Sequence, residues 1–246
     1  MKKFLPIVFA ALSLVGSARA ADDLHDSNGN LWLNYVGDHP LFGSPVGVHL
    51  EVQNRRAEMG DEWQQLLIRP GLNYQISPSL SVSAGWAYVK TYTYGDYPAA
   101  HDFPEHRAWE QAVYTHTGLG LDWTHRLRLE QRWIGEMEET DGDWDVANWR
   151  YENRIRYMLR TTIPLTKSKR TYLALWDEVF INFGENVKGN VFDQNRVFIG
   201  IGQKLTDTTR LEVGFMEQTL QRRGGNIWEN NHTASVWLTS KLPFEK

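Results

Sequence analysis

Charged and apolar residues alternate with a period of two along the segment from Trp123 to Trp133. The polar face carries Thr124, Arg126, Arg128, Glu130 and Arg132. The opposite face carries Trp123, His125, Leu127, Leu129 and Trp133. This period predicts a β-strand and excludes a helix. An apolar face closed by tryptophan at both ends is typical of a membrane-barrel strand, although an exposed edge strand of a soluble sheet would fit this segment equally well when taken alone.

The same pattern returns between Asn148 and Ile163. One face carries Arg150, Glu152, Arg154, Arg156 and Arg160, and the other carries Trp149, Tyr151, Ile155, Tyr157 and Leu159. Three later segments place Glu178, Arg196 and Glu212 on the polar face of an alternating strand. We therefore expect all these charges to point the same way, into the interior of one closed sheet.

Ten strands follow from the alternation along the chain. They cover Val46–Arg55, Trp63–Ile76, Leu80–Tyr94, Glu105–Thr117, Leu121–Ile134, Asn148–Ile163, Tyr172–Phe183, 192–202, Arg210–Arg222 and Glu229–Leu242. A bend or bulge is expected at Pro70-Gly71. The predicted fold is all-β, an antiparallel transmembrane β-barrel of ten to twelve strands with charged side chains filling the lumen.

The segment 31–45 does not fit the ten-strand set. Residues 22–30 are polar and are expected to be mobile, and Leu31 to Val36 form a short strand that is one too many, because single-chain bacterial barrels use an even number. This strand lies inside the lumen or against the periplasmic rim, or a twelfth strand exists near His39 to Ser44. The pattern leaves these alternatives open.

Turn lengths alternate along the predicted barrel. Short connections occur near Pro78, Gly118, Lys167 and Asp207, and long ones near Asp96, Asp141, Asn186 and Gly224. Membrane barrels place short turns in the periplasm and long loops outside. The C-terminus is therefore expected in the periplasm.

The N-terminus has the pattern of an export signal. Lys2 and Lys3 precede an apolar segment from Phe4 to Val15, and Ala18-Arg19-Ala20 supplies small residues at the cleavage site. Residues 1–20 are predicted to be a removed signal peptide, and residues 21–246 a single barrel domain in the outer membrane. The sequence contains no cysteine, which excludes disulfides and thiolate metal sites.

Composition is compatible with this class. The mean hydropathy of −0.49 would suit a soluble protein, but half of each barrel strand faces a polar lumen. Eleven tryptophans and ten tyrosines would supply aromatic girdles at the membrane interfaces. The net charge of −4 is too small to indicate a nucleic-acid partner. We expect a monomer without cofactors whose partners are outer-membrane lipids, lipopolysaccharide and the barrel-assembly machinery.

Several motifs resemble those of one bacterial family. They are W-Q-Q-L-L-I-R-P-G-L-N-Y (63–74), T-Y-x-Y-G-D-Y-P (91–98), P-E-H-R-x-W-E-Q (104–111), H-R-L-R-L-E-Q-R-W-I-G (125–135), N-W-R-Y-E-N-R-I-R-Y (148–157), D-E-V-F-I-N-F-G (177–184), F-D-Q-N-R (192–196) and Q-R-R-G (221–224). The resemblance is to a domain-of-unknown-function family regarded as outer-membrane β-barrels. It implies the barrel and the compartment, but no activity and no catalytic residue.

The predicted lumen network is the main candidate site. It comprises Arg126, Arg128, Glu130, Arg132, Arg150, Glu152, Arg154, Arg156, Glu178, Arg196 and Glu212, with Glu110 as a further carboxylate partner. Arginine–carboxylate pairs would fill and rigidify a narrow barrel. Because arginines outnumber carboxylates, a porin-like, arginine-lined path or binding site for small anions is the functional interpretation.

Three further interpretations are open. An outer-membrane hydrolase would use His101, Asp102 and His106, or Asn231, His232 and Ser235, although neither set has the spacing of a known triad. The acidic segment 136–145 contains Asp141, Asp143 and Asp145, which lack the remaining ligands of a calcium loop, so a solvated acidic loop is favoured. A soluble periplasmic β-sandwich that serves as a binding module is the alternative fold.

Overall fold

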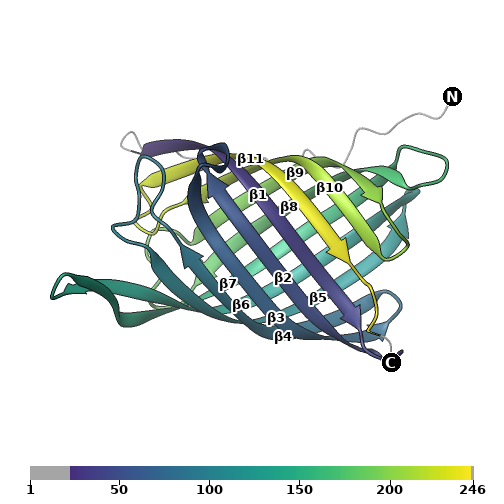
Figure 1. Ribbon diagram of the computed structural model, residues 1–246, viewed down its shortest axis with the longest axis horizontal. Coiled ribbons are helices and arrows are strands. Elements are labelled where there is room, and N and C mark those ends of the chain that lie inside the picture. The colour runs from purple at the N-terminus through teal and green to yellow at the C-terminus, as the bar shows by residue number, and fades with distance from the viewer. Residues whose placement is uncertain (1–22, 245–246) are drawn as a thin grey trace.

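The computed structural model describes residues 23–244, and these form one closed β-barrel (Figure 1). The strands are β1 Leu24–Pro40, β2 Val46–Ala57, β3 Glu62–Ser77, β4 Leu80–Thr91, β5 Phe103–Gly118, β6 Leu121–Thr140, β7 Asp143–Pro164, β8 Thr171–Phe183, β9 Phe192–Lys204, β10 Thr209–Gln221 and β11 Ile227–Ser240. A 3-10 turn, η1 (Glu58–Gly60), joins β2 to β3. The all-β barrel prediction is confirmed, and the closed ring overturns the two-sheet sandwich alternative.

Consecutive strands pair antiparallel all around the ring, except where β1 meets β11. Those two strands run parallel, from Leu24 opposite Ile227 to Gly37 opposite Ser240. An odd number of up-and-down strands brings the first and last strand together in the same direction, so this closure must be parallel. The prediction of an even strand number is wrong, because the described barrel has eleven strands.

The extra strand of the sequence prediction lies in the barrel wall, neither in the lumen nor against the rim. It runs from Leu24 to Pro40 and includes most of the polar stretch that was expected to be mobile. Asp26, Asn28 and Asn30 resemble a loop in composition, but they are buried because they face the lumen. No twelfth strand is present in the described residues, since residues 41–45 form the turn from β1 to β2.

The Pro70-Gly71 pair does not form a bulge. The pairing of β3 with β4 is interrupted between Ile68 and Gly71, but the register is the same on both sides. Gly71 has a different role, because a Cβ atom there would lie 2.6 Å from the ring of Trp109. The absence of a side chain lets the Trp109 indole, which is 1% exposed, pack flat against the wall.

The acidic segment 136–145 is not a loop. β6 and β7 continue beyond the rim and are joined by the two-residue turn Asp141-Gly142, whose positive φ values of 55° and 90° fit a tight hairpin. This hairpin projects beyond the left end of the barrel in Figure 1.

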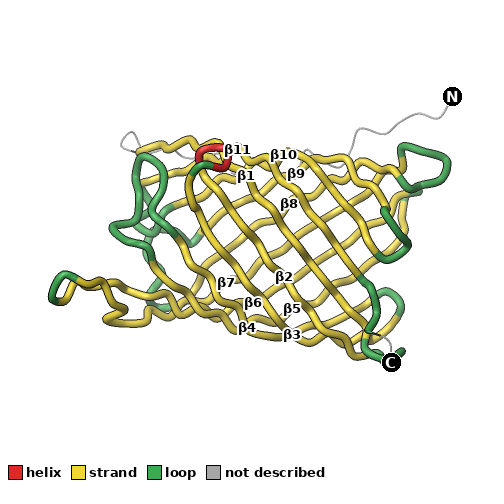
Figure 2. Tube along the Cα trace, viewed as in Figure 1, coloured by secondary structure: helices red, strands yellow, loops and turns green. Residues whose placement is uncertain are grey.

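The two ends of the barrel differ in their connections. At one end lie five turns, between β1 and β2, β3 and β4, β5 and β6, β7 and β8, and β9 and β10. At the other lie the β6–β7 hairpin and longer loops such as 92–102 and 184–191 (Figure 2). We call these the short-turn end and the long-loop end. Within residues 23–244, no helix is long and apolar enough to cross a membrane.

Candidate functional site in the lumen

The side chains of the predicted network point into the lumen. On β6 and β7 the even-numbered positions from Arg126 to Arg132 and from Arg150 to Arg160 face inward, while Leu127, Trp133, Trp149 and Tyr157 are exposed on the outer surface. Glu178, Arg196 and Glu212 lie on the inner faces of β8, β9 and β10. Strand alternation alone therefore brings these charges together, because every second residue enters the lumen.

Glu130 is the centre of the network and is completely buried. Its carboxylate accepts hydrogen bonds from Arg154 at 2.5 Å, Arg156 at 2.8 Å and Arg69 at 2.9 Å, and Arg107 lies 3.8 Å away. These four arginines come from β3, β5 and β7, so a single carboxylate on β6 ties together three other strands of the wall.

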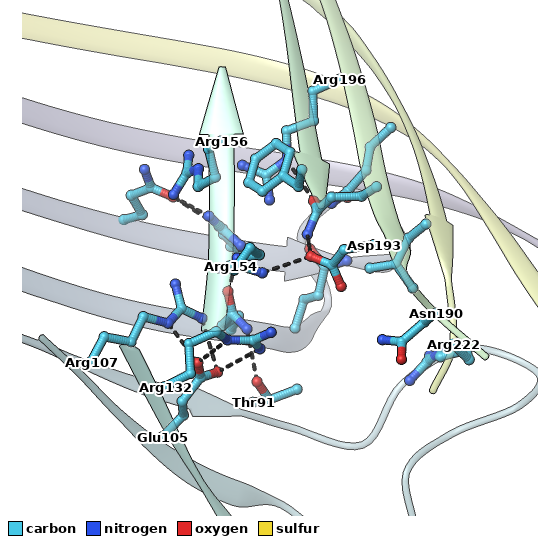
Figure 3. Close-up of a pocket in the computed structure, with 18 of the residues that line it drawn as sticks. Thr91, Glu105, Arg107, Arg132, Arg154, Arg156, Asn190, Asp193, Arg196 and Arg222 are labelled. Atoms are coloured by element: carbon cyan, nitrogen blue, oxygen red, sulfur yellow. Dashed lines mark hydrogen bonds and ion pairs between the residues drawn. The ribbon is translucent and has the colours of Figure 1, made fainter. Parts of the chain in front are cut away.

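Glu105 holds a second pair of arginines at the long-loop side of this centre. Arg107 donates to both of its oxygens, at 2.7 and 2.9 Å, and Arg132 donates to the same oxygens at 2.6 and 3.2 Å. Figure 3 shows both guanidinium groups converging on this carboxylate, and Arg154 reaching across to Asp193 at 2.7 Å. Each of these carboxylates is buried and paired with at least one arginine.

The remaining predicted residues form smaller groups. Arg150 and Arg132 lie 2.8 and 3.8 Å from Glu152. Glu178 is shared by Arg126 and Arg156, each at 2.8 Å. Glu212 is not joined to the other predicted residues by any ion pair in the described chain; it pairs with Arg160 at 2.5 Å and accepts from Tyr172.

Two buried arginines have no carboxylate oxygen within 4.0 Å in the described part of the chain. Arg55 donates to the side chains of Gln53 and Gln65, and Arg196 donates to Gln194 at 2.9 Å. Both guanidinium groups stack on Trp32, with 4.0 Å from Arg55 and 4.9 Å from Arg196 to the ring centre. Aromatic stacking and neutral amides replace the counter-ion here.

A cavity of about 230 Å³ lies in the lumen toward the long-loop end, beside these two arginines. Nine arginines line it, namely Arg55, Arg69, Arg107, Arg132, Arg154, Arg156, Arg196, Arg222 and Arg223. The carboxylates in the lining are Glu51, Glu105 and Asp193. We call this space the upper compartment; its surface carries an excess of positive charge.

Loops fold over the mouth of the upper compartment. Tyr94, from the loop 92–102, donates to Glu229 on β11 at 2.6 Å, and Arg222 lies 2.7 Å from the same carboxylate. Burial and the adjacent Glu229 carboxylate raise the pKa of Tyr94 well above its ordinary value. From the loop 184–191, the backbone carbonyl of Asn190 accepts a hydrogen bond from the Asn182 side chain inside the barrel. The mouth is therefore partly covered by its own loops.

The structure also corrects part of the predicted site. Glu110 faces outward and contacts Gln131, so it cannot pair with the lumen arginines, and Glu105 takes that role. The sequence prediction omitted Glu51, Arg55, Arg69, Arg107 and Asp193. The alternation of polar and apolar residues could have identified four of them. Glu51 and Arg55 lie on the polar face of β2, and Glu105 and Arg107 lie on the same face of β5.

The geometry does not assemble either hydrolase candidate. Asn231 and Ser235 are buried on the inner face of β11, whereas His232 points outward and pairs with Glu217. His101 stacks on Trp144, and Asp102 lies near Lys90. His106 lies against Trp86 and Trp149 on the outer surface. Within residues 23–244, no group of three metal-binding side chains is found, so Asp141, Asp143 and Asp145 do not converge on a cation.

Comparison with known proteins places this barrel in a family. The family model described as "Protein of unknown function (DUF2490)" matches residues 29–230. The chain belongs to this family. It is also similar to an uncharacterised protein of Methylorubrum extorquens, with 28% identity over 239 residues, which cover 94% of this chain and 96% of that protein. The family resemblance expected from the sequence motifs is thus confirmed, and the matched region runs from within β1 into β11.

Proposed function

We propose that this protein is an outer-membrane β-barrel whose closed lumen binds small, strongly hydrophilic anions in the upper compartment. The observation that carries the proposal is the pair Arg55 and Arg196, two buried guanidinium groups beside a cavity that have no carboxylate partner among residues 23–244. A phosphate-like or carboxylate anion would complete their hydrogen bonding.

The outer surface supports a membrane location. Exposed apolar side chains on the outer face include Leu72, Leu127, Ile155, Ile199, Ile201 and Val213. The ten-residue separation of Trp123 and Trp133 corresponds to about 33 Å along a strand, or about 25 Å along the axis of a barrel with strands tilted by about 40°. That length matches the apolar band of an outer-membrane barrel, about 25 Å tall.

Some polar groups on the outer face are paired with one another. Asn195 donates to Asp177 at 2.6 Å, and His232 pairs with Glu217 at 2.7 Å. Carboxylates that face lipid cost less than lysine or arginine, and a bonded neighbour lowers that cost further. Lipids and lipopolysaccharide are the partners that this surface fits, after delivery by the barrel-assembly machinery as a monomer.

The lumen charges support an anion as the ligand. Guanidinium groups stay protonated, and an isolated buried charge is costly unless it is paired. Arg55 and Arg196 recover part of this cost from Trp32 and from glutamine side chains. A bound anion would supply the missing counter-charge, which is why we favour an anion over a neutral solute or a cation.

The network argues against a permanently open, porin-like channel. From Glu130, ion pairs continue through Arg69 to Glu51 on β2 and through Arg154 to Asp193 on β9. Arg156, Arg196, Glu51 and Gln53 line both the upper compartment and a second cavity below it. A barrel of this size is largely filled by its own side chains. Binding of a solute in one compartment fits this ion-pair network better than free diffusion of the solute through the barrel.

Calorimetric titration of the refolded barrel with inorganic phosphate tests the proposal. We expect binding to the wild-type protein, and a loss of at least about tenfold in affinity in a variant carrying Arg55→Gln and Arg196→Gln. Arg56→Gln is the matched control, because Arg56 neighbours Arg55 but bonds to the η1 backbone and to Asp61. Equal affinities in the double variant and the control would contradict the proposal.

A further inference from the structure

The lumen holds a second cavity toward the short-turn end, with a volume of about 260 Å³. We call it the lower compartment. Its lining combines an apolar wall and a cationic floor.

The apolar wall is formed by Met158, Trp176 and Trp237. Trp176 is buried, stacks on Phe198 with 5.2 Å between ring centres, and meets Trp237 edge-on at 6.0 Å. The interior of a membrane barrel is generally polar. A cluster of large apolar side chains that lines a cavity there is therefore a surface suited to an apolar ligand group.

The floor is formed by Arg126 and Arg128, two residues apart on the inner face of β6. Arg128 is 1% exposed, and its Nε and Nη2 both donate to Gln111, at 2.9 and 2.6 Å. Arg126 donates to Glu178 through Nη2 at 2.8 Å. Among residues 23–244, neither Nη1 of Arg128 nor Nε of Arg126 has a hydrogen-bond partner.

The carboxylate nearest to Arg128 forms an ion pair with it but makes no hydrogen bond to it. Glu51 lies 3.5 Å from Arg128, but it makes no hydrogen bond to it and binds Arg69 at 2.6 Å instead. A buried donor that lacks a hydrogen bond is expensive, so Nη1 of Arg128, which has no hydrogen-bond partner among the described residues, would gain from an incoming acceptor.

From this arrangement we infer that the lower compartment binds an amphipathic monocarboxylate. The carboxylate accepts hydrogen bonds from Arg128 Nη1 and Arg126 Nε, and the aromatic or aliphatic body lies against Met158, Trp176 and Trp237. Arg210 and Lys241 also line this cavity near the short-turn end, where they favour the entry of an anion. Arg196 also lines this cavity, but the proposed contacts here are Arg126 and Arg128, and the ligand belongs to a different class from that of the upper compartment.

Calorimetric titration of the refolded barrel with cinnamate tests this inference. We expect saturable binding of cinnamate and none of the neutral analogue cinnamamide, which matches its shape but lacks the charge. This comparison uses the wild-type protein only, so it does not depend on whether a variant folds. Equal binding of both compounds, or no heat with cinnamate at millimolar concentration, would overturn the inference.

Two variants locate the site. Arg128→Gln is expected to weaken cinnamate binding by at least about tenfold. Arg170→Gln is expected to leave it unchanged, because Arg170 bonds to backbone carbonyls of Lys204 and Leu205 at the same end of the barrel. Phosphate binding in the upper compartment should persist in Arg128→Gln. The two titrations therefore test the two proposed binding sites separately. Unchanged cinnamate affinity in Arg128→Gln would overturn the assignment.

Discussion

Arg154 donates twice to the same oxygen of Glu130, from Nε at 2.8 Å and from Nη2 at 2.5 Å. Arg156 and Arg69 occupy the other oxygen of this carboxylate. One negative charge thus holds three directly bonded cations in a region shielded from solvent. Removing the Glu130 carboxylate would therefore leave several buried arginines without their counter-ion. Removing an arginine that has no carboxylate partner would leave no buried charge unpaired.

Glu130→Gln should therefore be strongly destabilising. Breaking a buried ion pair by removing one partner costs about 3–5 kcal/mol. We expect a loss of this size in the free energy of unfolding, measured by urea titration of the refolded barrel. Glu139→Gln, on the exposed part of the β6–β7 hairpin, is the control. Equal unfolding midpoints for the two variants would show that Glu130 is not the centre of the network.

Arg196→Met should leave the stability of the barrel unchanged or increase it, in contrast to Glu130→Gln. Methionine keeps apolar contact with Trp32 and Phe180 and removes a buried charge that has no carboxylate partner. We expect the free energy of unfolding, measured in phosphate-free buffer, to stay the same or to rise. Arg154→Met is the comparison, because it leaves Glu130 and Asp193 without their closest cation, and it should be destabilising. A large loss of stability in Arg196→Met would indicate a partner for Arg196 that this structure does not contain.

Leu127→Arg should impair membrane insertion. Leu127 is 49% exposed on the outer face, midway between Trp123 and Trp133. An arginine at the middle of the lipid-facing band costs about 2–4 kcal/mol. The folded fraction in membrane extracts, measured by heat-modifiable migration on gels, should fall. Glu138→Arg on the projecting hairpin should not change it. Equal folded fractions would argue against a lipid-facing surface at Leu127.

The parallel closure of the ring can be tested by crosslinking. Leu33 and Val236 lie opposite each other on β1 and β11, and the chain has no native cysteine. Leu33→Cys combined with Val236→Cys should give an intramolecular crosslink with a short bifunctional thiol reagent. The displaced pair Leu33→Cys with Lys167→Cys, whose second site lies in the turn between β7 and β8, should not. Failure of the first pair to crosslink would contradict the eleven-strand ring.

Strand alternation explains how much of the fold could be predicted from the sequence. β6 and β7 carry arginine and glutamate on one face and large apolar residues on the other, so their inner faces could be assigned without a structure. Within β1, the segment from Leu31 to Val36 was predicted as a strand, but the preceding residues were not, because Asn28 and Asn30 have the composition of a loop and only their burial in the closed ring identifies a strand.

The sequence could predict which charged residues face the lumen, but not which arginine pairs with which carboxylate. Glu110 was expected to serve the lumen arginines, but its even number on β5 places it outside, while Glu105 faces in. Whether Arg55 and Arg196 have a carboxylate partner depends on which strands face one another across the lumen. The distances between facing strands follow from the number of strands and from the way the ring closes, and the alternation along one strand does not predict either.

Single-channel recording in planar bilayers tests the divided, anion-binding lumen most directly. With the network around Glu130 intact, the wild-type barrel should insert without steady open-channel steps. Glu130→Ala should give a larger ionic current than the wild-type protein. Stable, ohmic conductance steps in the wild-type protein, unchanged by Glu130→Ala, would contradict a lumen closed by this network and would favour an open pore.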